Sequence, residues 1–177
     1  PAPVSADHAF GRLADADHRL PLKLVIGDQN VVPAIDDAPD PDCVFINLGT
    51  GAFILRPLPT GDIPSQPDPF QLSILGRSGR KGAQTRYALE GSIHGAGSAL
   101  NWLCARDSIE KIDPAIDDAL VTEHAPGLFL NTVDGLGSPW WCPGPPPEFA
   151  PSEGLTNRQR VAAVVESIVF LLRVNLE

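Results

Sequence analysis

Short apolar runs separated by turn residues fill the first third of the chain and predict strands. The runs comprise residues 22–26, 43–47 and 52–55. Val and Ile are frequent in them, and runs of this length between turn residues are typical of buried strands. Gly49-Thr50-Gly51 separates the second run from the third. We therefore expect residues 43–57 to form a hairpin around this Gly-Thr-Gly turn.

Three further strands are expected downstream, at residues 70–75, 85–89 and 127–131. The proline-rich stretch 142–152 is expected to be irregular, because proline interrupts regular backbone hydrogen bonding. Residues 36–42 are acidic and broken by proline, which is the composition of a linker, so we place a domain boundary there. The chain is thus predicted to be mixed α/β, with hairpins first and helices after them.

Helical periodicity is clearest near the end of the chain. Thr156 and Gln159 have the spacing of a capping box, and apolar residues then recur at i, i+3, i+4 and i+7. A second helix is predicted over residues 109–120, and a third begins at the small residues 95–99. Small residues at a helix start can admit a nucleotide. From spacing alone, close packing against another part of the backbone is the favoured interpretation.

Composition narrows the partners of the chain. Its 177 residues carry a net charge of −9, which disfavours nucleic acid or an anionic membrane as a partner. A nucleotide is still compatible, because backbone dipoles can hold phosphates. The cysteines, Cys43, Cys104 and Cys142, have neither metal-site nor disulfide spacing, which is typical of a reducing cytoplasm. The longest apolar stretch, residues 161–172, is too short to span a bilayer.

Candidate chemistry lies at the ends of the predicted strands. Asp28 follows the first apolar run and could take a proton from a substrate hydroxyl. The Gly-Thr-Gly turn could bring backbone N–H groups and the Thr50 hydroxyl to a phosphate. Together they suggest phosphoryl transfer to an alcohol, although a helix cap at Asp28 and a plain hairpin turn would explain the same residues. Trp140 and Trp141 could wall a ligand pocket or pack within a loop.

Five sequence blocks occur in an order and at spacings that are together far more specific than any one block. They are Ile26-Gly27-Asp28-Gln29; Asn47-Leu48-Gly49-Thr50-Gly51-Ala52-Phe53; Tyr87-Ala88-Leu89-Glu90-Gly91 with Ala96-Gly97-Ser98-Ala99-Leu100-Asn101-Trp102-Leu103; Gly135-Leu136-Gly137-Ser138-Pro139-Trp140-Trp141; and Ala163-Val164-Val165-Glu166-Ser167-Ile168. In these blocks the chain resembles the FGGY carbohydrate kinases, and it looks closest to their glycerol-kinase-like branch. The resemblance extends over nearly the whole chain, from about Val4 onward.

The resemblance implies a fold and a set of site residues. The fold is the actin-like, or ribonuclease H-like, ATPase fold, in which two α/β domains hold ATP, Mg²⁺ and a sugar or polyol between them. Residues 1–37 would end the first, substrate-binding domain, and residues 38–177 would begin the second, ATP-binding domain. Asp28 would be the general base, and Gln29 and Phe53 would contact the substrate. The nucleotide would be bound by Gly49, Thr50, Gly51, Gly97, Leu100 and Asn101.

Departures from the family pattern shape the expected activity. The chain contains no Asp-x-Gly-Thr motif, which in the family belongs to a preceding domain that also carries the magnesium-binding carboxylate. It also stops before the Gly-rich adenine loop of the family. We therefore expect an internal fragment that is inactive alone, with no metal ligand assigned, from a cytoplasmic kinase. The alternative is a non-catalytic, truncated module that assembles with a partner, and self-association is left open. A hydrolase is disfavoured, since Gly-x-Ser-x-Gly is absent.

Overall fold

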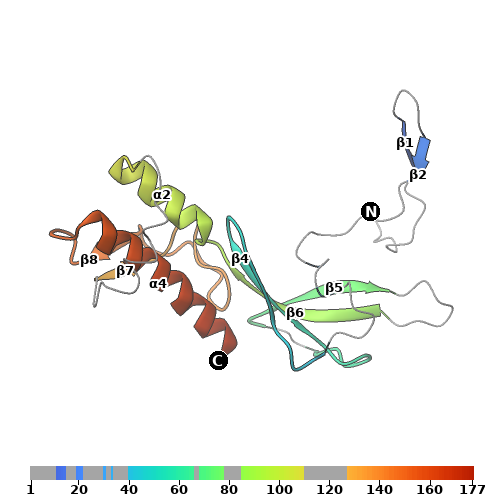
Figure 1. Cartoon of the computed structure of the whole chain (residues 1–177). Helices are drawn as coiled ribbons and strands as arrows, with labels where there is room; N and C mark the ends of the chain where they lie inside the picture. Colours follow the sequence, from blue (N-terminus) through green and yellow to red (C-terminus); the bar gives the residue numbers. More distant parts are fainter. Residues whose placement is uncertain are drawn as a thin grey trace. The chain divides into compact units, whose positions relative to one another are not determined.

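The computed structural model describes residues 11–14, 19–21, 30, 33, 40–65, 68–77, 85–109 and 127–177. Its elements are β1 Arg12–Ala14, β2 Arg19–Pro21, β3 Phe45–Leu48, β4 Ala52–Pro57, β5 Gln71–Arg77, β6 Thr85–Ile93, α2 Gly97–Asp107, β7 Leu128–Leu130, β8 Glu148–Ala150 and α4 Asn157–Leu176 (Figure 1). The strand predicted at 22–26 lies outside the described residues. So does the helix predicted at 109–120, except for Ile109.

The chain divides into two compact units. Unit 1 comprises Pro1–Phe45, Leu55–Pro67 and Gln71–Glu90. Unit 2 comprises Ile46–Ile54, Asp68–Phe70 and Gly91–Glu177. Four strands form one sheet in the order β3-β4-β6-β5, and β3, β4 and β6 each contribute residues to both units. The domain boundary that we placed at residues 36–42 stays a prediction.

Unit 1 is built on the antiparallel pair β5 and β6. Their register joins Leu72 to Leu89 and shifts between Ile74 and Gly76, which leaves Leu75 at the irregularity. Leu75 is nevertheless buried, in a small core with Leu55 and Ala88. Apolar side chains at alternate strand positions leave water together, and this burial stabilises the pairing. The strands predicted at 70–75 and 85–89 are confirmed, and β6 continues to Ile93.

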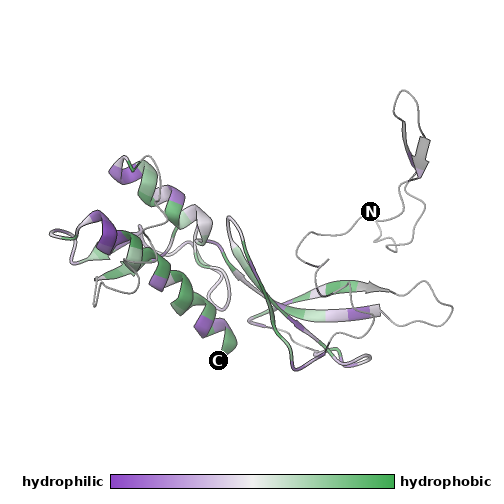
Figure 2. Cartoon of the chain, viewed as in Figure 1, coloured by the Kyte–Doolittle hydropathy of each residue, from purple (hydrophilic) through white to green (hydrophobic). Residues whose placement is uncertain are grey.

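The core of unit 2 lies between helices α2 and α4 and the hairpin of β7 and β8. It contains Ala99, Leu103, Phe129, Val133, Phe149, Val161, Ala163 and Val164. Figure 2 shows the apolar residues that recur along α4. The predicted capping box is confirmed, because the Thr156 hydroxyl accepts from the Gln159 N–H and the Gln159 side chain accepts from the Thr156 N–H. No helix in the described part of the chain is both long and apolar enough to cross a membrane.

Strand β8 corrects the expectation that residues 142–152 are irregular throughout. Phe149 lies opposite Phe129 in the antiparallel register of β7 and β8, and their ring centroids are 4.7 Å apart. Phe149 is buried, whereas its neighbours Glu148 and Ala150 are exposed. One buried aromatic residue among prolines gives no visible alternation, so the sequence pattern could not predict this strand. Packing against β7 in the tertiary structure determines it.

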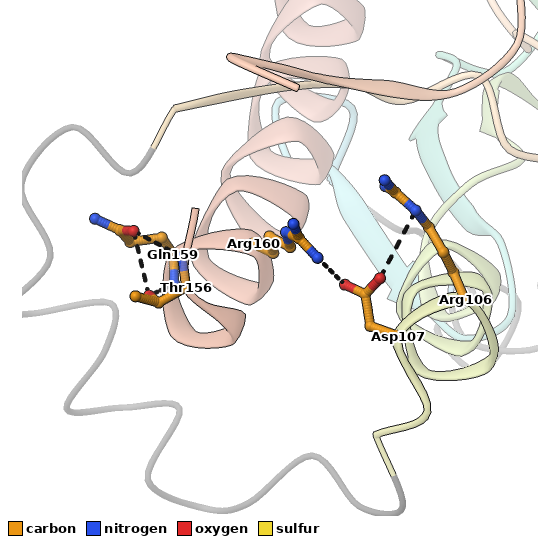
Figure 3. A network of polar contacts seen from close by, with 5 residues as sticks. All are labelled: Arg106, Asp107, Thr156, Gln159 and Arg160. Carbon is orange, nitrogen blue, oxygen red and sulfur yellow. Dashed lines mark hydrogen bonds and ion pairs between the residues drawn. The ribbon is translucent and has the colours of Figure 1, made fainter. Parts of the chain in front are cut away.

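An ion pair joins the end of α2 to the start of α4. Arg160 donates to the Asp107 carboxylate at 2.9 Å, and the two side chains are only 21% and 10% exposed (Figure 3). The Arg160 guanidinium also lies 5.9 Å from the Phe149 ring centroid. Because both side chains are largely buried, water could not easily solvate the Arg160 guanidinium if the Asp107 carboxylate were removed.

We expect Asp107→Asn to lower the free energy of unfolding of unit 2 by about 1.5–3 kcal/mol, because Arg160 keeps its charge and loses its carboxylate. Urea or thermal unfolding measures the change. The control is Glu177→Gln, which removes the Arg173–Glu177 pair, whose side chains are 74% and 64% exposed. Exposed helix pairs of this spacing contribute about 0.3–0.5 kcal/mol. Equal effects of the two substitutions would contradict the prediction.

Candidate functional site

The Gly-Thr-Gly turn connects β3 to β4, as the sequence predicts. The Gly49 N–H donates to the Gly51 carbonyl at 2.8 Å and closes the turn. Thr50 is exposed at its tip, and its hydroxyl makes no hydrogen bond within the described residues. The turn therefore presents a free hydroxyl donor together with backbone that carries no bulky side chain, a combination that suits a phosphate oxygen.

The same turn lies directly against the start of α2. The Gly97 N–H donates to the Gly49 carbonyl and the Ser98 N–H to the Thr50 carbonyl, each at 2.9 Å. The first N–H groups of a helix lack partners within that helix, and here the turn supplies them. The structure thus brings together two predicted site segments that are almost fifty residues apart in the sequence. It also means that these two N–H groups are not available to a ligand.

Two glycines allow other parts of the backbone to approach closely, one at the start of α2 and one in the turn. A Cβ atom on Gly97 would lie 2.6 Å from the Gly49 carbonyl oxygen, and one on Gly51 would lie 2.9 Å from the Ile93 carbonyl oxygen. Real Cβ atoms do not approach backbone oxygen so closely. Of the two interpretations of the small residues at 95–99, the structure favours approach of another backbone, namely the Gly-Thr-Gly turn.

The remaining predicted site residues lie at different places. Leu100 and Asn101 occupy the first turns of α2, where Leu100 packs against the unit 2 core and Asn101 is exposed. Phe53 is half-buried on β4. Asp28 and Gln29 lie outside the described residues, so their distance from the turn is not defined. The structure therefore brings Gly49, Thr50 and Gly51 together with Gly97, while the binding and catalytic roles of all these residues, Asp28 included, stay predictions.

A buried polar network holds the segment after β7, and sequence reasoning missed it. The Ser138 hydroxyl accepts from the Ser92 N–H at 2.7 Å and donates to the Asn175 carbonyl oxygen at 2.5 Å. The Asn175 amide group donates in turn to the Ser138 carbonyl at 3.1 Å. All three residues are buried. Hydrogen-bonded buried polar groups fix geometry, so this network positions residues 135–141 beside the end of β6.

A second polar contact fixes the segment that leads into α2. The Asn131 amide group donates to the Gly95 carbonyl at 2.7 Å and to the Ser167 hydroxyl at 3.0 Å. Asn131 follows β7, so it ties the end of that strand to the start of α2 and to α4. In the sequence, these contacts are indicated only by single Ser and Asn residues inside apolar stretches. No spacing rule predicts which of them hydrogen-bond to each other, because they lie far apart along the chain.

The described residues contain no group of three His, Cys, Asp or Glu side chains that could hold a metal ion. Cys43, Cys104 and Cys142 are free thiols. The negative charge of nearby Asp40 raises the pKa of the Cys43 thiol, and so does the charge of Asp42 to a smaller extent. A raised pKa disfavours the thiolate, so Cys43 is not an activated nucleophile.

Comparison with known proteins gives a consistent set of relatives, although no family model matches the chain. The chain is 39% identical over 130 residues to glycerol kinase of Arabidopsis thaliana, which covers 71% of this chain and 24% of that protein. It is 31% identical over 171 residues to glycerol kinase 1 of Lactiplantibacillus plantarum, covering 94% of this chain and 32% of that protein. The chain thus spans about a quarter to a third of the length of these relatives.

Solved structures agree with this set. Plasmodium falciparum glycerol kinase with ADP superposes with a TM-score of 0.62 at 24% identity, over 95% of this chain and 34% of that one. A ligand-bound xylulose kinase of Lactobacillus acidophilus gives a TM-score of 0.60 at 24% identity, over 89% of this chain and 31% of that one. At these identities the likeness establishes the fold.

Proposed function

We propose that the whole protein transfers a phosphoryl group from ATP to a hydroxyl of a sugar or polyol. The reason is that the chain belongs to the glycerol-kinase-like branch of the FGGY carbohydrate kinases. The fold is the actin-like ATPase fold of these kinases, mixed α/β as the sequence predicts. The whole protein would be a phosphotransferase with an alcohol acceptor, and the 177 residues would supply part of its active site.

The observation that carries this proposal is the contact between the Gly-Thr-Gly turn and α2. Phosphoryl transfer depends mainly on positioning and charge stabilisation, so a rigid phosphate cradle is a minimum requirement. Two backbone hydrogen bonds hold Gly49 and Thr50 against Gly97 and Ser98. The Thr50 hydroxyl would donate to a phosphate oxygen, and Gly49 and Gly51 would let the nucleotide approach the backbone.

The other roles follow from the family resemblance. Gly97, Leu100 and Asn101 would contact the nucleotide from α2, and exposed Asn101 has an amide group free to do so. Asp28 would take the proton from the acceptor hydroxyl, while Gln29 and Phe53 would contact the sugar or polyol. The free cysteines support a cytoplasmic location.

The family also implies Mg²⁺ as the companion of ATP. The described residues offer it no cluster of three suitable side chains, so they do not fit a metal site of their own. No step of this proposal is therefore assigned to a metal ligand in this chain.

Thr50→Ala tests the phosphate cradle directly. We expect it to weaken ADP binding to the 177-residue chain by about 1.5 kcal/mol, or roughly tenfold in Kd, because a hydrogen bond to a charged oxygen is lost. Isothermal titration calorimetry measures the affinity. The control is Thr60→Ala, the same change at an exposed threonine of unit 1. Unchanged ADP affinity in Thr50→Ala would contradict the proposed role of the turn.

The alternative, a non-catalytic module that assembles with a partner, has one observation in its favour. Apolar side chains of α4 and β7 are exposed, and they include Leu128, Val169 and Phe170 at 62%, 54% and 53%. Large exposed apolar areas are typical of surfaces that another polypeptide covers. Absence of ADP binding together with tight association with another chain would favour this alternative.

A further inference from the structure

An open pocket in unit 2 is separate from the residues that the proposed kinase chemistry uses. Its volume is about 410 Å³, within the roughly 300–1,000 Å³ that is usual for small-molecule sites. We call it the Trp141 pocket. Its lining comes from the residue after β6 and from the loop between β7 and β8, and includes His94, Asp134, Leu136, Trp141, Cys142 and Pro143. The described residues assigned to the nucleotide and to the acceptor do not line it, so its ligand is a different one.

The loop presents two of the pocket side chains from an unusual backbone conformation. Asp134 and Trp141 have φ values of +59° and +48°, and for a bulky residue such as tryptophan a positive φ is an outlier. Ser108 is the other non-glycine residue of the described chain with a positive φ, and it ends a helix. Backbone conformations of this cost concentrate at functional sites, where the surrounding structure enforces them. The loop is therefore shaped around the pocket.

Hydrogen bonds hold the loop in this conformation. Leu136 and Cys142 exchange backbone hydrogen bonds of 2.7 and 3.1 Å, and the Trp141 backbone N–H donates to the Gly137 carbonyl at 2.8 Å. The Trp141 indole N–H donates to the Pro69 carbonyl at 2.6 Å. Because its N–H is already bound, the indole offers a ligand only its π surface. Of the two interpretations of the paired tryptophans, the structure favours the pocket wall for Trp141.

The polar groups of the pocket favour a positively charged ligand. Asp134 is exposed, and its carboxylate has no hydrogen-bond or ion-pair partner within the described residues. His94 Nδ1 lies 3.0 Å from the Asp134 carbonyl oxygen, which can only accept, so Nδ1 carries the hydrogen and Nε2 of the neutral ring is an acceptor. No lysine or arginine occurs among the described residues of the lining. A carboxylate, a ring nitrogen acceptor and an indole face all attract a cation.

A guanidinium group matches these three groups better than other cations do. It is planar, stacks on aromatic rings and carries N–H donors in a fixed fork. It can lie on the Trp141 ring, donate in parallel to both oxygens of the Asp134 carboxylate, and donate a further N–H to His94. An ammonium group has no flat face. A metal ion would lack ligands, because no group of three suitable side chains occurs in the described part of the chain.

We propose that the Trp141 pocket binds a guanidinium group, supplied by a small molecule or by an arginine side chain of another polypeptide. Trp141 would be the stacking platform, Asp134 the counter-charge and His94 an additional acceptor. The inference goes beyond the proposed function and does not depend on it, since it requires neither ATP nor the sugar or polyol acceptor.

The test is an NMR titration of the 177-residue chain with ethylguanidinium, followed by the backbone N–H signals of Gly135 and Leu136. We expect saturable shifts. Two matched probes isolate the chemistry. Propylammonium has the charge without the planar fork and should bind more weakly, and N-ethylurea has the planar shape without the charge and should not saturate. An end-blocked Gly-Arg-Gly peptide separates the two sources, since tighter binding than ethylguanidinium indicates a polypeptide and equal binding a small molecule.

Two variants test the assigned side chains. Asp134→Asn should weaken ethylguanidinium binding roughly tenfold, because a hydrogen bond to a charged group is lost. Asparagine tolerates the φ of +59°, so the loop keeps its conformation. Trp141→Leu keeps an apolar side chain without the π face and should weaken binding roughly two- to fivefold. The controls are Trp140→Leu and Glu153→Gln, at exposed residues of unit 2 outside the lining, which should bind normally.

Three outcomes would overturn the inference. The first is the absence of saturable shifts with ethylguanidinium. The second is equal binding of N-ethylurea, which would mean that charge plays no part. The third is unaltered affinity in Asp134→Asn. ADP affinity is measured on the same samples. Loss of ADP binding with normal ethylguanidinium binding contradicts only the proposed function, and the reverse result contradicts only this inference.

Discussion

Asp28→Asn in the whole protein is expected to lower kcat by about 10² to 10⁴, the usual contribution of a general base. Asparagine keeps the shape of the side chain but cannot take a proton from the acceptor hydroxyl. Nucleotide affinity should stay nearly unchanged, because Asp28 is proposed to act on the acceptor. Steady-state kinetics with ATP and the sugar or polyol acceptor of the whole protein, together with ADP titration, separate the two effects.

The control for this experiment is Asp42→Asn, which neutralises an exposed carboxylate in the acidic run and should leave kcat unaltered. Full activity of Asp28→Asn would mean that the carboxylate only caps a helix. The catalytic assignment of Asp28 would then be withdrawn, while the phosphate cradle of the Gly-Thr-Gly turn would still stand on its own test.

Gly97→Val should disrupt the contact between the Gly-Thr-Gly turn and α2 from the helix side, and with it the proposed phosphate site. The new Cβ would lie 2.6 Å from the Gly49 carbonyl oxygen, so the turn and α2 must separate and lose the two hydrogen bonds between them. Overpacking typically costs about 1–3 kcal/mol, and here the obstructing atom belongs to the backbone, so we expect about 3 kcal/mol in unfolding free energy. ADP affinity should fall at least tenfold as the turn moves.

Two controls isolate the clash from other effects of the substitution. Gly49→Ala places a Cβ at an ordinary 3.7 Å from the Gly51 carbonyl oxygen and should fold normally. Ala105→Val introduces a β-branched residue at an exposed position of the same helix and should cost well under 1 kcal/mol. Thermal unfolding and calorimetry report on all three variants. A Gly97→Val protein as stable as these controls, with normal ADP binding, would refute the role that we assign to this contact.

The sequence by itself determined those features that depend on neighbours along the chain. The hairpin around Gly49-Thr50-Gly51 and the capping box at Thr156 involve residues only a few positions apart, so their patterns are legible without the fold. The mixed α/β class and the kinase family could also be recognised from short blocks in order. The strand at 22–26, the helix at 109–120 and the roles of Asp28 and Gln29 stay predictions.

Only the tertiary structure decided which of these pieces meet. Three contacts join residues about twenty to fifty positions apart: the hydrogen bond from Gly97 to Gly49, the pairing of Phe149 with Phe129, and the hydrogen bond from Ser138 to Asn175. Such contacts depend on how closely two backbones approach, and a glycine or a serine allows that approach without imposing a periodic pattern. Local sequence patterns therefore specify the individual helices and strands, and long-range packing brings the segments of the candidate site together.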